Sequence, residues 1–189
     1  MTEKTTFKAF LKPLDSQRLK KRSNLKNNLL NSLKDTVTEQ IPAIAPILPT
    51  LFPKKSPVIV YRLEDHVSLY AVANKPVLFE TGDHIISPTL FIAMHYPGML
   101  PAVYIDEGAV KAIFRGAFLM AAGVKEIPSQ FPANQVVEIR LLGQSVPCAL
   151  GVSQISSEEL ASQPKGQGIL VLTFLRDSLY MASLNELAA

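Results

Sequence analysis

The sequence contains a single cysteine among 189 residues, and this scarcity narrows its chemistry. Cys148 has no second cysteine with which to form an internal disulfide, and no Cys-x-x-Cys pair exists to hold zinc or iron. We therefore expect a protein of a reducing compartment without a metal site. Cys148 itself lies in an apolar segment and is predicted to serve packing rather than catalysis.

Long hydrophobic runs are also missing. The longest apolar stretch, residues 41–52, is short and is broken by Pro42, Pro46 and Pro49. The first residues lack the apolar core of a signal peptide. We expect a cytoplasmic protein that makes no use of a membrane.

Familiar catalytic patterns are absent as well. The three histidines do not form HExxH, and no GxSxG or GxGxxG occurs. Residues 165–168, Lys-Gly-Gln-Gly, are too short for a phosphate-binding P-loop. Asp83 and His84 suggest a carboxylate and imidazole pair, but such neighbours after a glycine are more typical of a polar turn. We expect no enzyme activity and no cofactor.

What the sequence does contain is an uneven distribution of charge. Residues 1–60 carry eleven Lys and Arg against four Asp and Glu, whereas residues 61–189 carry eight against twelve. The two parts are therefore near +7 and −4. Clustered cations favour contact with a polyanion such as nucleic acid, although a solvated basic helix face explains them equally well.

The first half has the pattern of an α+β unit. Leucines and a valine recur every fourth residue from Leu25 to Val37, which predicts one amphipathic helix over residues 16–40 with Ser16 as its cap. A short second helix or turns follow over residues 41–52. Three β-type runs predict an antiparallel meander, at residues 58–61, 67–72 and 77–79. A helical turn or two is expected around residues 88–94, with Pro88 in its first turn.

The second half predicts a compact barrel. Its expected elements are a strand at 102–105, a helix at 107–114, and strands near 136–142, 148–155 and 169–175. A short proline-marked connection joins the halves. The predicted fold class is therefore α+β, with an N-terminal α+β domain over residues 1–98 packed against a C-terminal barrel over residues 99–189.

Several motifs of the second half resemble a PUA domain, a small barrel that binds structured RNA. They are Ile105-Asp106-Glu107-Gly108-Ala109-Val110-Lys111, Arg115-Gly116-Ala117, Ala122-Gly123-Val124, Pro147 to Val152, Ser156 to Glu159, Lys165 to Gly168 and Leu175 to Tyr180. They occur in order over about residues 100–183. The resemblance implies a PUA pseudo-barrel and RNA as its ligand.

Motifs in the first half indicate a particular family among proteins with a PUA domain. Residues 51–57, Leu-Phe-Pro-Lys-Lys-Ser-Pro, residues 88–90, Pro-Thr-Leu, and residues 96–101, Tyr-Pro-Gly-Met-Leu-Pro, resemble the malignant T-cell-amplified sequence family. The resemblance implies a non-enzymatic translation factor that acts on the small ribosomal subunit with a density-regulated-protein-like partner supplied in trans. The implied roles are ribosome recycling, release of deacylated tRNA and translation re-initiation.

The sequence departs from the family pattern at three places. Phe91 stands where a basic residue is frequent, Ala121-Ala122 stand in place of Cys-Pro, and Tyr180 replaces the tryptophan of the closing motif. These changes predict a shifted pattern of RNA contacts, with a packing role kept by Tyr180.

The candidate RNA-binding residues follow from these motifs and from the basic clusters. They are Arg115, Gly116, Ala117, Lys125, Lys165, Gly166 and Arg176 in the second half, and Lys20, Lys21, Arg22, Lys54 and Lys55 in the first. Each has a plainer explanation: glycines turn barrel corners, and lysines at turns are usually only solvated. No partner-binding surface is predicted.

Two other functions fit the same residues. A PUA-containing accessory of an RNA-modification complex would dock a modifying enzyme through its first domain. An adaptor that has lost RNA binding would use protein contacts alone, which the acidic balance of residues 61–189 favours. Salt-dependent RNA affinity separates this adaptor from the RNA-binding alternatives.

Overall fold

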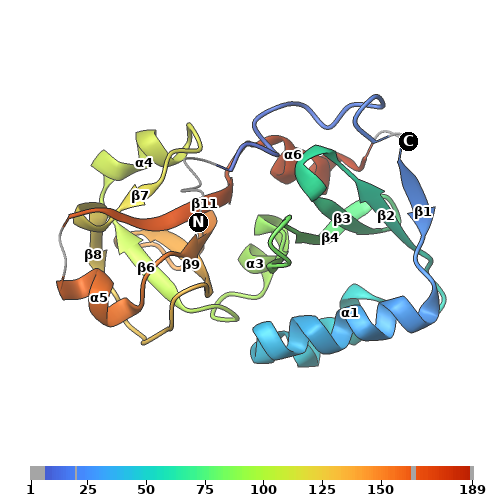
Figure 1. The fold of residues 1–189 in the computed structure, drawn as a ribbon, viewed down its shortest axis with the longest axis horizontal. Helices are drawn as coiled ribbons and strands as arrows, with labels where there is room; N and C mark the ends of the chain where they lie inside the picture. Colours follow the sequence, from blue (N-terminus) through green and yellow to red (C-terminus); the bar gives the residue numbers. More distant parts are fainter. Residues whose placement is uncertain (1–6, 20, 163–164, 188–189) are drawn as a thin grey trace.

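The computed structural model describes residues 7–19, 21–162 and 165–187. It has two bodies side by side, an antiparallel sheet flanked by helices and a small barrel (Figure 1). The predicted α+β class, with a C-terminal barrel, is confirmed.

The N-terminal sheet has strands in the order β1-β2-β3-β4-β5, and all neighbours are antiparallel. The strands are β1 (Arg22–Asn24), β2 (Val58–Arg62), β3 (Ser68–Val72), β4 (Lys75–Glu80) and β5 (Ile86–Pro88). The predicted meander corresponds to β2, β3 and β4. Short turns suffice because consecutive antiparallel strands are neighbours.

The predicted long helix is wrong in its first part. Helix α1 begins at Asn27 and ends at Gln40, while Arg22–Asn24 form the edge strand β1. The reason is visible in the sequence, since the four-residue apolar repeat begins only at Leu25 and Lys26 occupies the N-cap in place of Ser16. The short helical segment after α1 is confirmed as η1 (Pro42–Ile47) and α2 (Leu48–Leu51).

Pro88 also lies elsewhere than predicted. It belongs to β5 and pairs with Leu78, and helix α3 (Leu90–His95) begins after it. Thr89 is the N-cap, and its side chain accepts a hydrogen bond from the Ile92 amide at 3.4 Å. The threonine hydroxyl therefore starts the helix rather than the proline ring.

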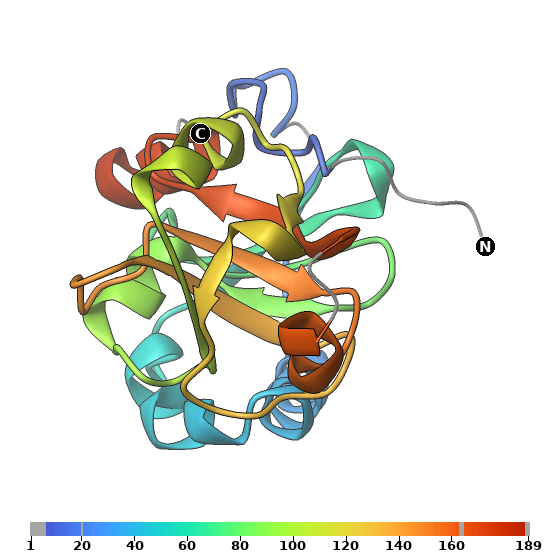
Figure 2. The ribbon, with the colours of Figure 1, turned by 90° about the vertical axis from the view of Figure 1, so that its left-hand side faces the viewer.

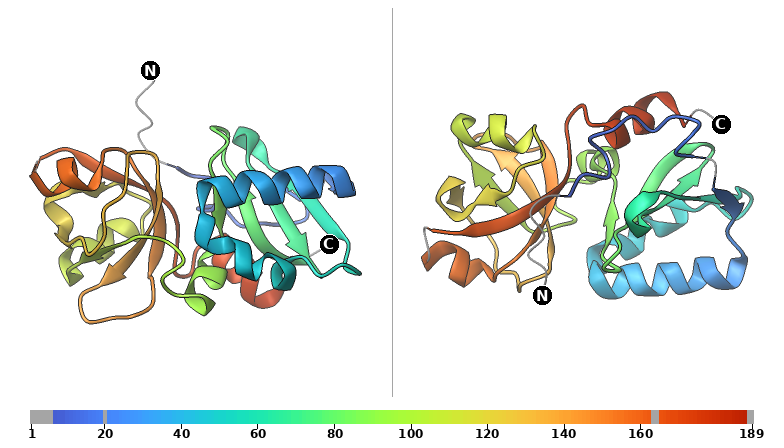
Figure 3. Two further views of the ribbon diagram at one scale, coloured as in Figure 1. Left: turned by 90° about the horizontal axis from the view of Figure 1, so that it is seen from below. Right: turned by 45° about the horizontal axis from the view of Figure 1, so that its top comes forward.

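Helices cover both faces of this sheet, as the view from below shows (Figure 3). Helix α1 lies on one face, and helix α6 (Ser178–Asn185), from the far end of the chain, packs against β4 on the other. Phe10 of the N-terminal segment meets Phe79 of β4 edge to face, with ring centroids 5.1 Å apart. The sheet is thus buried on both sides, which explains the near-continuous apolar run in β4.

The barrel contains a second sheet in the order β7-β11-β10-β9-β6-β8 (Figure 2). Its strands are β6 (Ala102–Ile105), β7 (Leu119–Met120), β8 (Val124–Glu126), β9 (Val136–Leu141), β10 (Ala149–Ser153) and β11 (Gln167–Phe174). The short turn η3 (Ala121–Gly123) connects β7 and β8, which end the sheet on opposite sides, so the sheet nearly closes on itself. Two helices cap the barrel, α4 (Glu107–Ile113) and α5 (Ser157–Ser162); the remaining turn, η2 (Glu64–His66), joins β2 to β3.

The two bodies share a core and a buried anchor. The larger apolar cluster runs from the N-terminal sheet to barrel residues such as Leu150 and Leu172, whereas a second cluster fills the barrel interior. Glu138, fully buried, binds Arg140, and the Glu138 amide donates to the Pro101 carbonyl of the linker at 2.8 Å. The predicted boundary between residues 98 and 99 falls in this linker and stays a prediction.

Candidate nucleic-acid interface

Helix α4 begins at a capped and charged corner of the barrel. The Asp106 carboxylate accepts a hydrogen bond from the Ala109 amide at 3.2 Å and lies 3.1 Å from the Lys125 ammonium group. The hydrogen bond from Lys125 lowers the pKa of Asp106. Lys125 on β8 therefore pairs with the N-cap carboxylate of α4 while its side chain stays about 41% exposed.

Gly116 ends the same helix. Its φ is +72°, its amide donates to Ile113, and the Ala117 amide donates back to Ala112, which is the hydrogen-bond pattern of a Schellman motif. A Cβ atom at Gly116 would lie 3.1 Å from the Leu11 side chain. Gly116 thus has a structural purpose that needs no ligand, and its RNA contact stays a prediction.

The loop at Lys165 and Gly166 lies against the closing turn of the barrel. The Gly166 carbonyl accepts a hydrogen bond from the Ala121 amide at 3.0 Å, and Gln167 pairs with Met120. The loop and Lys125 therefore flank the same turn, η3. Beside this turn is a shallow hollow of about 300 Å³, lined in part by Asp106, Met120 and Lys125.

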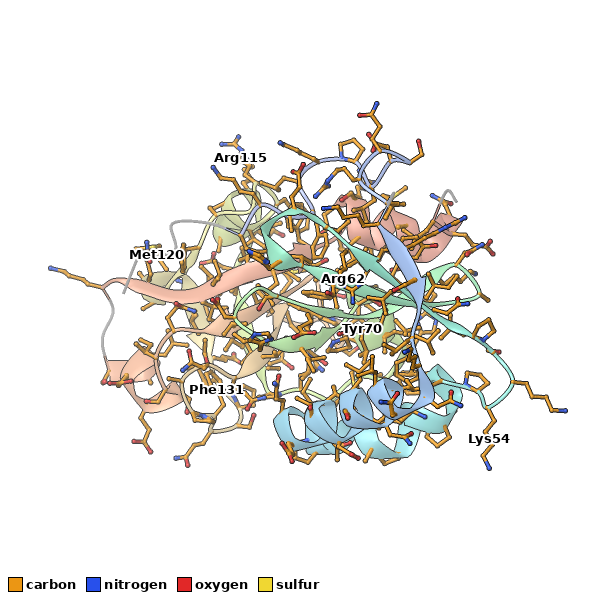
Figure 4. The ribbon with its side chains drawn as sticks, turned by 45° about the vertical axis from the view of Figure 1, so that its right-hand side comes forward. Lys54, Arg62, Tyr70, Arg115, Met120 and Phe131 are labelled. Carbon is orange, nitrogen blue, oxygen red and sulfur yellow. The ribbon has the colours of Figure 1, made fainter. Side chains whose placement is uncertain are left out.

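Sequence analysis did not select Met120, which lies between the motifs Arg115-Gly116-Ala117 and Ala122-Gly123-Val124. Its side chain is 47% exposed and lines the hollow together with Lys125. Figure 4 shows Met120 on the barrel, away from Lys54. A polarizable thioether beside cations provides an adaptable contact for a base or sugar. Pattern alone gave no signal, because β7 is only two residues long and has no readable alternation.

Arg115 and Arg176 lie toward the junction of the two bodies. Arg176 adopts φ +71° between β11 and α6 and lines a groove of about 590 Å³. The floor of this groove includes Phe114 and Phe174, whose rings stack with centroids 5.9 Å apart. Arg115 follows Phe114 directly and is exposed.

The helix that follows Arg176 depends on a buried carboxylate. Asp177 accepts hydrogen bonds from the amides of Phe174 at 3.0 Å and Tyr180 at 2.7 Å. Burial raises the pKa of Asp177 to about 6 in spite of these donors. Tyr180 is half-buried and packs against the larger core, which confirms its predicted packing role.

The predicted basic residues of the first half lie elsewhere. Lys54 and Lys55 are exposed in the turn between α2 and β2, far from Arg115 and Met120 (Figure 4). Lys21 and Arg22 are exposed at β1, and Lys20 lies outside the described residues. The candidate residues therefore form three separate groups: η3 with its flanking loop, the junction, and the basic N-terminal turns and edge.

The thiol and the histidine–carboxylate pair outside the candidate interface have structural explanations. The Cys148 thiol donates to the Ile139 carbonyl at 3.3 Å, and burial raises its pKa to about 11, so it stays a protonated packing group. Residues Asp83 and His84 lie at the β4–β5 turn, where the His84 imidazole contacts Glu80 at 2.7 Å. Over residues 7–19, 21–162 and 165–187, no cluster of three or more His, Cys, Asp or Glu has metal-binding geometry. Nor is any described helix long and apolar enough to cross a membrane.

Fold and motifs together define a two-domain protein of the PUA class. Residues 14–97 match the family model of the Pre-PUA-like domain, and residues 101–175 match that of the PUA domain. Neither matched model describes a catalytic domain.

The sequence comparisons identify the particular family. The chain is 30% identical over 145 residues to the malignant T-cell-amplified sequence 1 homolog of Dictyostelium discoideum, covering 75% of this chain and 80% of that protein. It is 29% identical over 143 residues to translation machinery-associated protein 20 of Schizosaccharomyces pombe, covering 74% and 79%. The chain belongs to the malignant T-cell-amplified sequence family, as the resemblance indicated.

A solved structure supports the fold. The crystal structure of a hypothetical protein from Pyrococcus horikoshii superposes with a TM-score of 0.70 at 20% identity, covering 86% of this chain and 99% of that chain. At this identity the likeness concerns the arrangement of the two bodies and not their ligands.

Proposed function

We propose that this chain is a non-enzymatic, cytoplasmic translation factor that binds RNA and the small ribosomal subunit together with a density-regulated-protein-like partner. Its roles would be ribosome recycling, release of deacylated tRNA and re-initiation. The observation that carries the proposal is family membership over three-quarters of the chain, including a relative named for its association with the translation machinery.

The barrel supplies the first contact in this proposal. Lys125 and Lys165 flank the η3 turn, and the exposed Met120 lines the hollow with Lys125 and pairs with Gln167 of the Lys165 loop. Cations that neutralise phosphate position a nucleic acid, while a shaped hollow recognises its conformation. Binding energy alone then shifts the occupancy of tRNA on the subunit.

The N-terminal basic residues supply a second contact. Because Lys54 and Lys55 lie far from η3, one protein would touch the subunit RNA at two separated places (Figure 4). Two tethered contacts strengthen binding more than either contact alone, provided that both can be made at once. A shared apolar core between the two bodies favours a fixed geometry for such binding.

Co-sedimentation with purified small ribosomal subunits, with and without the partner and across a salt series, tests the proposal. We expect binding that the partner strengthens and that weakens as salt rises, because phosphate contacts release counterions. The control variant Lys75→Gln removes an exposed cation that is in none of the three groups. Absence of binding under every condition would favour the RNA-modification accessory or the protein-only adaptor.

A further inference from the structure

The N-terminal domain has a groove of its own, between helix α1 and the sheet. Its volume is about 580 Å³, and residues of α1 line it. Helix α1 lies on the face of the sheet opposite α6 (Figure 3). This size is within the range of small-ligand sites, roughly 300–1,000 Å³. The groove shares no residue with the hollow at η3 or the groove at Arg176.

One end of the groove is a pre-ordered polar network. The Tyr70 hydroxyl donates to one Glu80 oxygen at 2.6 Å, and the His84 Nδ1 atom lies 2.7 Å from the other. Burial, together with this hydrogen bond, raises the pKa of Tyr70, so the phenol stays protonated. Both residues line the groove and leave further acceptor positions on the carboxylate and phenol oxygens.

A cation stands beside this network. Arg62, at the end of β2, lines the groove, and its Nη1 atom makes only a long, 3.5 Å contact with the Ser23 hydroxyl among the described hydrogen bonds. The Arg62 amide donates to the Lys21 carbonyl at 2.8 Å, which places Lys21 and Arg22 on the adjacent edge strand. The polar end of the groove therefore opens next to the basic edge of the sheet (Figure 4).

The rest of the lining is mixed: Ser32, Thr36, His66 and Ser68 are polar, and the other side chains are apolar. Val60 and Ile86 of the sheet are buried at the floor, while Leu29 of α1 is 50% exposed at the wall. Packing in the core explains why Val60 and Ile86 are apolar, but it does not explain the exposed Leu29 side chain. An apolar wall opposite a cation and a hydroxyl network suits a ligand with a flat apolar part and an anionic end.

We propose that this groove is a subsite for one extruded nucleotide of a single RNA strand. Arg62 binds the phosphate, the Tyr70 and Glu80 end accepts hydrogen bonds from the ribose hydroxyls, and the base lies against Leu29. The inference rests on the proposed RNA-binding function and adds a nucleotide site that the candidate residues did not include. Single-stranded RNA is recognised through such splayed nucleotides, and the 2′-hydroxyl gives a site its preference for RNA.

Methyl and histidine NMR titration of the whole chain with the four ribonucleoside monophosphates tests the site. We expect at least one to shift the Leu29, Ile86 and His84 signals. Ribose 5-phosphate and inorganic phosphate are the comparison ligands, and the deoxy form of the binding nucleotide should bind more weakly. Arg62→Gln should weaken the nucleotide about tenfold, while Lys75→Gln, the matched loss of one exposed cation, should leave affinity unchanged.

A second variant separates the base from the phosphate. Leu29→Ser should weaken the nucleotide several-fold and leave ribose 5-phosphate unaffected, and unchanged melting temperatures will show that both variants fold. Equal binding of inorganic phosphate and nucleotides, or no shift at the groove, would overturn the inference. Subunit co-sedimentation measured on the same samples keeps this result distinct, because binding there with no nucleotide shift here refutes the subsite alone.

Discussion

The barrel and the N-terminal domain use their cations differently. In the barrel, Lys125 is paired with Asp106, and Arg140 is paired with the buried Glu138. In the N-terminal domain, Lys54 and Lys55 stand exposed in a turn. Removal of Lys125 or Arg140 therefore breaks an ion pair within the fold as well as any RNA contact, whereas removal of a turn lysine tests binding with little structural cost.

The buried pair of the barrel gives the largest expected effect. Glu138→Ala leaves the Arg140 guanidinium, whose side chain is only 12% exposed, without its carboxylate, while the backbone hydrogen bond from residue 138 to Pro101 is kept. Breaking such a pair costs about 3–5 kcal/mol, because the remaining charge stays desolvated. Urea unfolding will measure the loss.

A double variant distinguishes the charge from the packing. Glu138→Leu with Arg140→Leu removes both charges and should lose much less stability than Glu138→Ala. A similar loss in both variants would show that side-chain packing around residue 138, and not the ion pair, carries the stability.

Asp177 gives the next largest effect, through pH. Its pKa of about 6 lies above the ordinary 3.8, so the folded state binds its proton more tightly than the unfolded state. Stability from this group is therefore greatest at low pH and falls as pH rises from about 4 to about 6. The expected difference between pH 4 and pH 7 is about 2 kcal/mol.

The control for this titration is Asp177→Asn. Asparagine cannot ionise, and its single acceptor oxygen serves only one of the two amides, so the variant should be less stable throughout. Its unfolding free energy should lack the fall between pH 4 and pH 6. Parallel pH profiles for wild type and variant would assign the titration to another group.

The third largest effect is expected at Gly116, where a substitution tests whether the contact between Gly116 and Leu11 stabilises the fold. Gly116→Ala adds a methyl group in the left-handed region, 3.1 Å from Leu11, and should cost about 1–2 kcal/mol. Gly143→Ala is the matched control, since Gly143 has φ +78° but no atom within 4 Å of its Cβ position. Equal losses at the two positions would mean that Leu11 yields freely and only backbone strain is measured.

The same comparison shows what the sequence can and cannot predict. The meander β2 to β4 was predictable because alternation and short turns are local properties. Strand β1 was not, since Arg22–Asn24 are exposed and show no apolar alternation, and they become a strand only by pairing with β2, more than thirty residues away. The basic residues of this segment resemble the polar face of a helix, but pairing with β2 makes the segment a strand.

The candidate site likewise has a part that local motifs predict and a part that depends on tertiary contacts. Motifs located the loop at Lys165 and the turn near Gly123, which the barrel brings together. They gave no sign that Gly116 packs on Leu11, because that contact joins segments distant in the chain. Arg62, Tyr70 and Glu80 lie within the predicted meander, but the motifs did not include them and the pattern did not give the register that brings them together. Motifs predict which residues belong to a site, whereas the fold determines which other residues lie beside them.

The smallest structural effect is expected where the effect on binding is most informative. Lys54→Glu with Lys55→Glu should leave the melting temperature unchanged, because exposed charges contribute little to stability. Binding to the small subunit should weaken, and the salt dependence should become shallower by up to about two counterions. Lys75→Glu reverses one exposed charge outside the candidate groups and should leave both quantities unchanged. If the double variant binds normally at physiological salt, these lysines are only solvated, and RNA contact in the first half must come from the β1 edge and the Arg62 groove instead.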